Sequence, residues 1–444
     1  MKDLTKGRPS VLILTFALPI FLANLLQLTY SLADTRIVGT FLGDNALAAV
    51  GATTTLSNLI VQFLMGMCNG FAIISAQCFG AKDMDRLRRS LGNSLVLGLL
   101  AAGVLTLGGL VFLQPILRFL NVPENLLNTA TQYVSVIIAG LVVTLLYDVL
   151  AATLRAIGDT VTPLIVLAVS VVLNIGGDLL LIVVLHMGVL GAAVATVLSQ
   201  LIAVVVCAIY LWKKYVILRI RVNDLKLQDA GMLRNMLSSG LSMGFMSSLV
   251  NIGTLTLQTS INKLGQNIII AHTAARKISE IFMIMFSVFG QTMATYCGQN
   301  LGAGEITRIK KGVHASSFLA FLTSAFISIV MFLFGKTLLS MFISGDPEQT
   351  SQVLAIAWHY LSIMASCLCI LYFLYVYRSA LQGLGNTMIP MLSGVVEFFV
   401  RVGVALLLPK LIGQNGIFYA EIAAWTGAAV LLMISYYINI RKFA

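Results

Sequence analysis

Long apolar stretches separated by short polar segments run along the whole chain. Twelve of them are long enough to cross a membrane, because a helical span needs about 20 mostly apolar residues. They cover residues 11–36, 50–79, 91–116, 129–156, 163–186, 188–212, 236–262, 267–297, 313–342, 350–382, 390–409 and 415–440. The first stretch lacks the small-residue cleavage site of a signal peptide, so we expect it to remain as a span. The pattern predicts an all-α integral membrane protein.

The second half of the chain repeats motifs of the first half. The motif from Gln77 to Ala81 returns from Gln299 to Ala303, 222 positions later. The motif from Gly158 to Thr160 returns from Gly385 to Thr387, 227 positions later. Each copy covers six spans, an even number, so both copies enter the membrane in the same orientation. The repeat therefore predicts two six-helix bundles related by a pseudo-twofold axis along the membrane normal, which is typical of transporters.

The polar stretch between the copies sets the expected domain boundaries. We expect an N-lobe over residues 1–212, a basic cytoplasmic linker over 213–235 and a C-lobe over 236–444. Because this linker is the longest polar stretch, we expect no separate soluble domain between the spans.

Composition supports the membrane assignment, and the basic residues indicate the orientation. Hydrophobic residues make up 59% of the chain and charged residues 10%, against roughly half and a quarter in soluble domains. With the N-terminus placed in the cytoplasm, 20 Lys and Arg residues fall on the cytoplasmic side, Arg155 and Arg378 among them, and 5 on the other side. Positive residues concentrate in cytoplasmic loops. We therefore expect both termini in the cytoplasm of a plasma membrane (the inner membrane of a bacterium or archaeon), and no nucleic-acid partner.

A few ionisable residues lie at membrane depth. Placing each charged side chain there costs at least ~2.5 kcal/mol, so each is expected to have a structural or functional role. Asp178 follows Asn174 by four residues, so both side chains lie on one helix face. Thr196 is in the next span across a short connection, and Asp34 is in the first span of the same half. These oxygen-bearing side chains could bind a hard cation, or the two carboxyls could hold a proton. Alternatively, they only satisfy helix-packing hydrogen bonds or lie near the interface.

Other charges in the spans are expected to pair. Glu397 and Arg401 are four residues apart, as are Arg276 and Glu280, so both pairs read as structural ion pairs. Glu421 lies only a turn inside its span and is expected to reach the interface.

One proline interrupts the first span. Pro19 removes a helix hydrogen bond, so a bend is expected there, either a hinge or static.

The motifs in combination resemble the multidrug and toxic compound extrusion (MATE) family over nearly the whole chain. They are Pro19 with Leu32 to Asp34 and Val38-Gly39, residues 77–81 and their copy, Leu154 to Asp159, Asn174 with Asp178, and Gly191 to Ala193 leading to Thr196. The resemblance implies a two-lobed, twelve-helix antiporter that exports lipophilic, often cationic compounds against Na⁺ or H⁺, without a cofactor.

Within the family the chain is similar to the branch that couples through the N-lobe. The resemblance implies a coupling site for Na⁺ or H⁺ at Asp34, Asn174, Asp178 and Thr196, and a cavity lined by Gln27 and Tyr147. Asp148, next to Tyr147, is a further candidate for the cavity. The other branch uses an acidic residue in the seventh span, and residues 236–262 contain no Asp or Glu.

The expected partners are small amphipathic solutes and the lipid bilayer, for a protein that we expect to be a monomer. The alternative function is a flippase for lipids or lipid-linked oligosaccharides, from the same superfamily of folds. An enzyme is not expected, because no Ser-His-Asp, Cys-His or metal-ligand spacing occurs.

The two copies differ at the candidate site. Carried through the repeat intervals, Asp34, Asn174, Asp178 and Thr196 correspond to Thr256, Arg401, Ala405 and Ala424. The ion chemistry is therefore expected only in the first copy.

Overall fold

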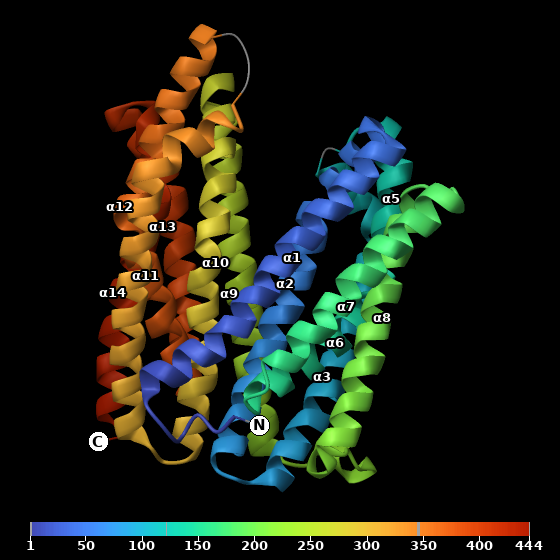
Figure 1. Ribbon diagram of the computed structural model, residues 1–444, viewed down its shortest axis with the longest axis vertical. Coiled ribbons are helices and arrows are strands. Elements are labelled where there is room, and N and C mark those ends of the chain that lie inside the picture. Colours follow the sequence, from blue (N-terminus) through green and yellow to red (C-terminus); the bar gives the residue numbers. More distant parts are fainter. Residues whose placement is uncertain (1, 121, 344–346, 444) are drawn as a thin grey trace. The chain divides into compact units, whose positions relative to one another are not determined.

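The computed structural model describes residues 2–120, 122–343 and 347–443. These residues form helices and no strands. Eleven helices among them are long and apolar enough to cross a membrane, and the bent pair of α5 and α6 makes a twelfth span. This confirms the all-α, twelve-span prediction (Figure 1).

The first copy contains α1 to α8. Its helices are α1 (Pro9–Leu42), α2 (Asp44–Gly80), α3 (Met84–Val111), α4 (Leu113–Phe119), α5 (Glu124–Ala139), α6 (Leu141–Ala156), α7 (Val161–Asp178), the π-helix η1 (Leu179–Val184) and α8 (Val189–Lys214). Between the copies lie the short 3₁₀-helices η2 (Val216–Leu218) and η3 (Val222–Leu225).

The second copy follows from α9. Its helices are α9 (Ala230–Ile261), α10 (Gln266–Gly302), α11 (Ile306–Ser340), α12 (Pro347–Gly383), α13 (Met388–Ile412), the 3₁₀-helix η4 (Gln414–Tyr419) and α14 (Ala420–Arg441).

The helix boundaries reproduce the sequence repeat. α2 and α10 both have 37 residues, and both ends differ by 222 positions. α7 and α13 begin 227 positions apart, at Val161 and Met388. Glycines with positive φ precede both long helices, Gly43 at 82° and Gly265 at 106°, a backbone conformation that other residues rarely adopt. The duplication seen in the sequence is thus a duplication of helices and turns.

The chain divides into two compact units whose boundaries fall within helices. One unit contains residues 18–244 with the first three residues, and the other contains residues 4–17 and 245–444. The first helix of each copy is therefore shared, with α1 divided at Leu18, next to Pro19, and α9 divided after Gly244. The boundaries expected from the polar linker were residues 212 and 236. The linker did not reveal this division because packing contacts, not polarity, determine it.

Specific contacts hold the segment before each first helix in place. In the second unit, the buried Leu4 donates its backbone N–H to Gln299 Oε1 at 3.0 Å, and Arg308 Nη2 donates to the Gly7 carbonyl at 3.0 Å. In the first unit, Arg88 Nε donates to Asp224 Oδ2 at 2.6 Å. The repeated motif at the end of α10 thus has a structural role, because Gln299 binds the segment before α1.

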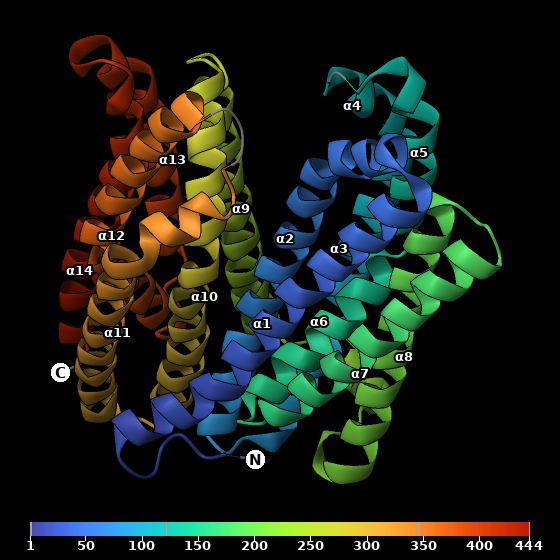
Figure 2. The ribbon, with the colours of Figure 1, turned by 45° about the horizontal axis from the view of Figure 1, so that its top comes forward.

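Each unit has its own core. In the first unit, buried aliphatic side chains of α2, α3, α5, α6 and α8 form one continuous cluster. In the second unit, α10 packs along α12 (Figure 2). The rings of Phe286, Phe289, Tyr372 and Tyr375 meet between these two helices. Between α5 and α6 the span bends by 43° at Gly140, which lies against the Val197 side chain of α8.

Candidate functional site

Small residues bring α7 and α8 close together in the first unit. A Cβ on Gly177 would lie 3.2 Å from the Ala195 Cβ, and one on Gly191 would lie 3.1 Å from the Leu181 backbone. Such residues allow helix backbones to approach each other. Their contact sets Thr196 of α8 alongside Asn174 of α7.

Asn174 of α7 contacts both Asp178 on its own helix and Thr196 on α8. It is 1% exposed, and Asp178 is fully buried. In the amide orientation that satisfies both of its polar atoms, Asn174 donates its nitrogen to Asp178 Oδ2 at 3.1 Å and accepts from the Thr196 backbone N–H at 3.3 Å through its oxygen. Asp178 is the last α-helical residue before the π-helix η1, a widened turn of a kind often found at functional sites.

The first helix completes this cluster with Asp34 and Tyr30. The carboxyl groups of Asp34 and Asp178 face each other within hydrogen-bonding reach. Tyr30, one turn before Asp34, places its hydroxyl 3.1 Å from Thr196 Oγ1. The structure thus brings together all four residues that the sequence singled out, and it adds Tyr30. The four-residue spacing from Tyr30 to Asp34 could have indicated it.

The chemistry of this cluster fits a monovalent cation or a proton. Asp34 Oδ1 and Asp178 Oδ1 are buried and have no hydrogen-bond partner among the described residues. Two facing carboxylates repel each other at low dielectric, and a bound cation or proton between them removes that repulsion. Among the described residues, no three His, Cys, Asp or Glu side chains converge on a metal-binding arrangement.

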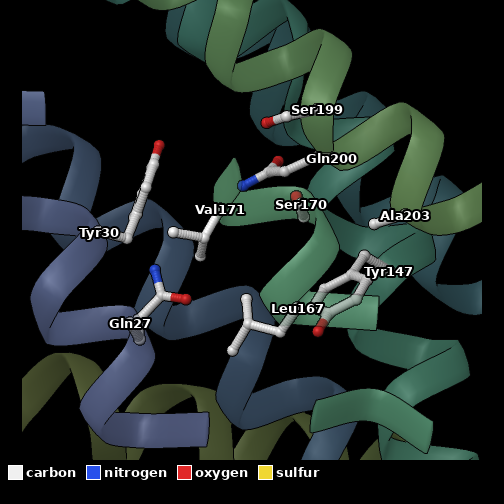
Figure 3. A pocket seen from close by; sticks show the side chains of 9 residues that line it. All are labelled: Gln27, Tyr30, Tyr147, Leu167, Ser170, Val171, Ser199, Gln200 and Ala203. Atoms are coloured by element: carbon white, nitrogen blue, oxygen red, sulfur yellow. The ribbon is translucent and has the colours of Figure 1, made fainter. Parts of the chain in front are cut away.

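A cavity with several polar side chains in its lining lies beside this cluster, within the first unit (Figure 3). Gln27 and Tyr30 of α1 face Ser199 and Gln200 of α8 across it, and Tyr147 of α6 lies at one end. Its lining consists of Gln27, Tyr30, Tyr147, Leu167, Ser170, Val171, Ser199, Gln200 and Ala203. Water-sized molecules have about 40 Å³ available, which holds a few waters or an ion, whereas a drug-sized ligand needs roughly 300 Å³ or more.

Two of the three residues predicted for the cavity are found there. Gln27 and Tyr147 line it, whereas Asp148 is not among the lining residues. Asp148 is next to Tyr147 on α6, so its side chain points to a different face of the helix. That face also carries Arg155, seven residues later. Gln200 accepts a hydrogen bond from Thr144 Oγ1 at 2.7 Å, and the sequence gave no signal for its role.

The second unit contains the predicted ion pairs, each with an additional partner. Glu397 is 3.5 Å from Arg401, and it also pairs with Arg378 of α12. Arg276 is 3.1 Å from Glu280, and its Nη1 is 2.7 Å from Glu421.

Two readings of the sequence need correction. Glu421 does not reach the interface: it is 4% exposed and accepts hydrogen bonds from Arg276 and from Tyr360 Oη. Arg378 was counted with the cytoplasmic loops but is 2% exposed inside α12. Its partner Glu397 lies on α13, and sequence spacing alone could not reveal a pair between two helices.

Comparison with known proteins gives a consistent assignment. Residues 19–180 and 242–407 match the MatE family, one segment from each copy. A Bacillus subtilis protein named probable multidrug resistance protein YoeA is 28% identical over 349 residues, which cover 76% of this chain and 75% of that protein. A second one, probable multidrug resistance protein YpnP, is 25% identical over 417 residues, covering 94% and 92%.

Solved structures share the fold. The crystal structure described as MATE in the bent conformation superimposes with a TM-score of 0.91 and 21% sequence identity, covering 99% of this chain and 97% of the other.

Proposed function

Since this chain belongs to the MatE family of membrane transporters, we propose that it is an antiporter that exports lipophilic, often cationic compounds against Na⁺ or H⁺. The observation that carries this proposal is the pair of facing carboxyls, Asp34 and Asp178, each with a buried oxygen that lacks a partner among the described residues. The names of the relatives, which refer to multidrug resistance and multidrug export, support the substrate class.

In the proposed cycle, the protein holds either an ion at the cation site or a solute in the cavity. With a cation or proton between Asp34 and Asp178, the repulsion between the carboxylates is removed and α1, α7 and α8 can stay close together. The cavity is then too small for a drug-sized compound. Loss of the ion leaves two negative charges, which favours a wider arrangement that admits a cationic solute. Solute and ion therefore compete, which couples their movement in opposite directions.

Pro19 is proposed as the hinge of α1. It lies beside the division of the chain into two units, and its missing N–H weakens the helix there. The protein is further proposed to lie in the plasma membrane as a monomer, with both termini in the cytoplasm and no cofactor. The basic residues of the loops support that orientation, since removing Arg378 from the cytoplasmic count leaves 19 against 5.

Transport by purified protein in liposomes tests this function. Na⁺ and pH gradients are imposed independently, and efflux of a fluorescent lipophilic cation is followed. We expect efflux that depends on at least one of the two gradients and is lost in Asp34→Asn. Gradient-independent movement of lipids with no solute efflux would instead support a flippase.

A further inference from the structure

An open apolar groove lies in the first unit and shares no lining residue with the cavity beside the cation site. Its ten lining residues come from α2, from α3 and from the break and short helix α4 that follow α3, and none of them has a polar side chain. Water-sized molecules have about 730 Å³ available there, within the ~300–1,000 Å³ of small-molecule sites. The groove is therefore large enough for part of a lipid or of another apolar ligand.

A helix break in the first copy borders this groove. α3 ends at Val111, because Pro115 has no N–H to donate to the Val111 carbonyl. The chain then turns into α4, which packs against α5. In the second copy, α11 begins 222 positions after α3, has Thr337 in place of Pro115 and continues to Ser340 without a break. The break, and the groove beside it, thus distinguish the first copy.

A glycine of α3 keeps the groove open. A Cβ on Gly108 would have nothing within 4 Å, so no neighbouring side chain requires glycine at this position. Glycine is unfavourable in the middle of a helix, which makes an unforced one informative. The repeat interval sets Val330 at this position in the second copy. Gly108 therefore provides space in the first copy that a side chain occupies in the second.

The rim of the groove faces lipid. α2 and α3 are both long and apolar enough to cross a membrane. Along the rim, Val104 is 71% exposed, Phe112 is 61% exposed and Phe119 is 84% exposed. Such large exposed apolar side chains on membrane-spanning helices mark a surface that contacts the bilayer.

One positive charge lies at the end of this groove. Arg118 directly precedes Phe119 on α4, and its side chain is 61% exposed. Its ion pair with Glu124 is long, at 3.6 Å, and exposed on both sides, so it contributes little. An arginine beside apolar residues at the end of a span places its charge at the level of the lipid headgroups. Its guanidinium group matches the oxygens of a phosphate.

From these observations we infer that the groove binds one phospholipid, with an acyl chain against Gly108 and the headgroup phosphate at Arg118. The charge at Arg118 favours an anionic lipid and disfavours a lipophilic cation as the occupant. Such a lipid site would exist whichever solute the protein exports.

Lipid binding can be measured on the full-length protein in a mild detergent. The protein is titrated with palmitoyl-oleoyl phosphatidylglycerol or with the phosphatidylcholine of the same chains, and bound lipids are counted by native mass spectrometry. We expect one phosphatidylglycerol to bind about 5-fold more tightly than phosphatidylcholine, the effect of one basic residue near an anionic headgroup. Retention of no lipid, or of several with equal affinity, would overturn the site.

Two glycine variants of α3 locate the acyl chain. Gly108→Leu fills the groove and should weaken the binding of the first phosphatidylglycerol about 10-fold or more, the effect of losing two buried methylene groups. Gly103→Leu is the matched control, because its added Cβ also has nothing within 4 Å but Gly103 does not line the groove. Both variants should fold, since leucine is favoured over glycine in a helix. Equal lipid affinity in the two variants would overturn the site.

A charge variant tests the headgroup contact. Arg118→Gln should reduce the affinity for phosphatidylglycerol to that for phosphatidylcholine. Lys263→Gln removes another exposed positive charge, at the same end of the spans, and should leave the preference unchanged. A preference for phosphatidylglycerol that persists in Arg118→Gln would contradict the inferred site.

The same spectra distinguish the other possible occupants. Displacement of the bound lipid by the lipophilic cation rhodamine 6G, lost in Gly108→Leu, would assign the groove to an export solute. A dimer of the native protein that disappears in Gly108→Leu would assign it to a second copy of the chain. Either result would overturn the lipid site, whereas a lipid-bound monomer that rhodamine 6G leaves intact supports it.

Discussion

The two copies of the repeat have nearly the same helices but different buried charged groups, two carboxyls in the first and ion pairs in the second. In the first, Asp34 and Asp178 face each other, and one oxygen of each has no hydrogen-bond partner in the part of the chain that the structure describes, next to a cavity lined by Ser170. In the second, the positions of Ser170 and Asn174 hold Glu397 and Arg401, and Arg378 joins them. Duplication thus supplied a common scaffold, and a few substitutions on aligned helices leave a pair of carboxyls in one copy and ion pairs in the other.

The largest expected difference in stability comes from removing one carboxylate charge in each copy. Glu397→Gln leaves two buried guanidinium groups without an anion, which should cost about 3–5 kcal/mol. Asp178→Asn removes a carboxylate that faces another one, so stability should stay the same or rise. Thermal unfolding of the purified variants in detergent measures both effects.

The control for this comparison is Glu280→Gln, since the Glu280 side chain is 58% exposed. An exposed ion pair contributes about 0–1 kcal/mol, so the unfolding midpoint should change little. A loss in Asp178→Asn as large as that in Glu397→Gln would mean that the acidic pair is structural.

A smaller effect is expected where α2 meets α9. A Cβ on Gly70 would lie 2.6 Å from the Ser239 backbone, and backbone cannot move aside easily. Gly70→Ala should therefore destabilise the protein by about 1–3 kcal/mol. The corresponding position in the second copy is Thr292, so the glycine that allows this approach is not repeated there.

Gly51→Ala on the same helix provides the matched control. Nothing lies within 4 Å of its added Cβ, and alanine is favoured over glycine in a helix by about 1 kcal/mol. Thermal unfolding should show opposite shifts for the two variants. Equal shifts would show that α2 and α9 are not in tight contact.

The smallest effect concerns pH and the turn before α7. Asp159 Oδ1 accepts from the Thr162 N–H at 3.0 Å, and Asn386 Oδ1 accepts from the Ile389 N–H at 3.3 Å in the second copy. Burial raises the pKa of Asp159, but hydrogen bonds from Tyr215 and Thr162 outweigh burial and hold this pKa below its usual range. A lowered pKa stabilises the fold above the ordinary Asp pKa of about 4, and this stabilisation is lost as pH falls through the lowered value.

Hydrogen exchange can follow both turns. Backbone exchange at residues 157–162 should accelerate on acidification below pH of about 4, whereas exchange at 384–389, corrected for the intrinsic rate, should not. Asp159→Asn should remove the difference between the turns. If acidification accelerates hydrogen exchange equally in both turns, protonation of Asp159 is not the cause of the acceleration.

Local patterns in the sequence were sufficient to predict the spans and the repeat. Hydropathy located the twelve spans, and the intervals of 222 and 227 positions match the starts of α2 with α10 and of α7 with α13. The cluster around Asp178 was also predictable, because spacing on α7 and the short connection to α8 restrict where the side chains can lie.

Contacts between distant helices could not be predicted in this way. Arg378 looked like a loop residue until α12 was seen to continue to Gly383 and to bring it beside Glu397. Glu421 similarly depends on Arg276, 145 positions earlier. The division of α1 and α9 between the units follows from packing, which a single sequence does not reveal.

The central claim, that ion coupling takes place in the first copy, is tested most directly by gradient-driven export from liposomes containing the native protein, Asp34→Asn, Asp178→Asn or Arg401→Gln. We predict that both Asp variants lose the dependence of efflux on the Na⁺ or pH gradient, whereas Arg401→Gln retains it for a cationic solute. Intact coupling in both Asp variants, or its loss only in Arg401→Gln, would contradict the account.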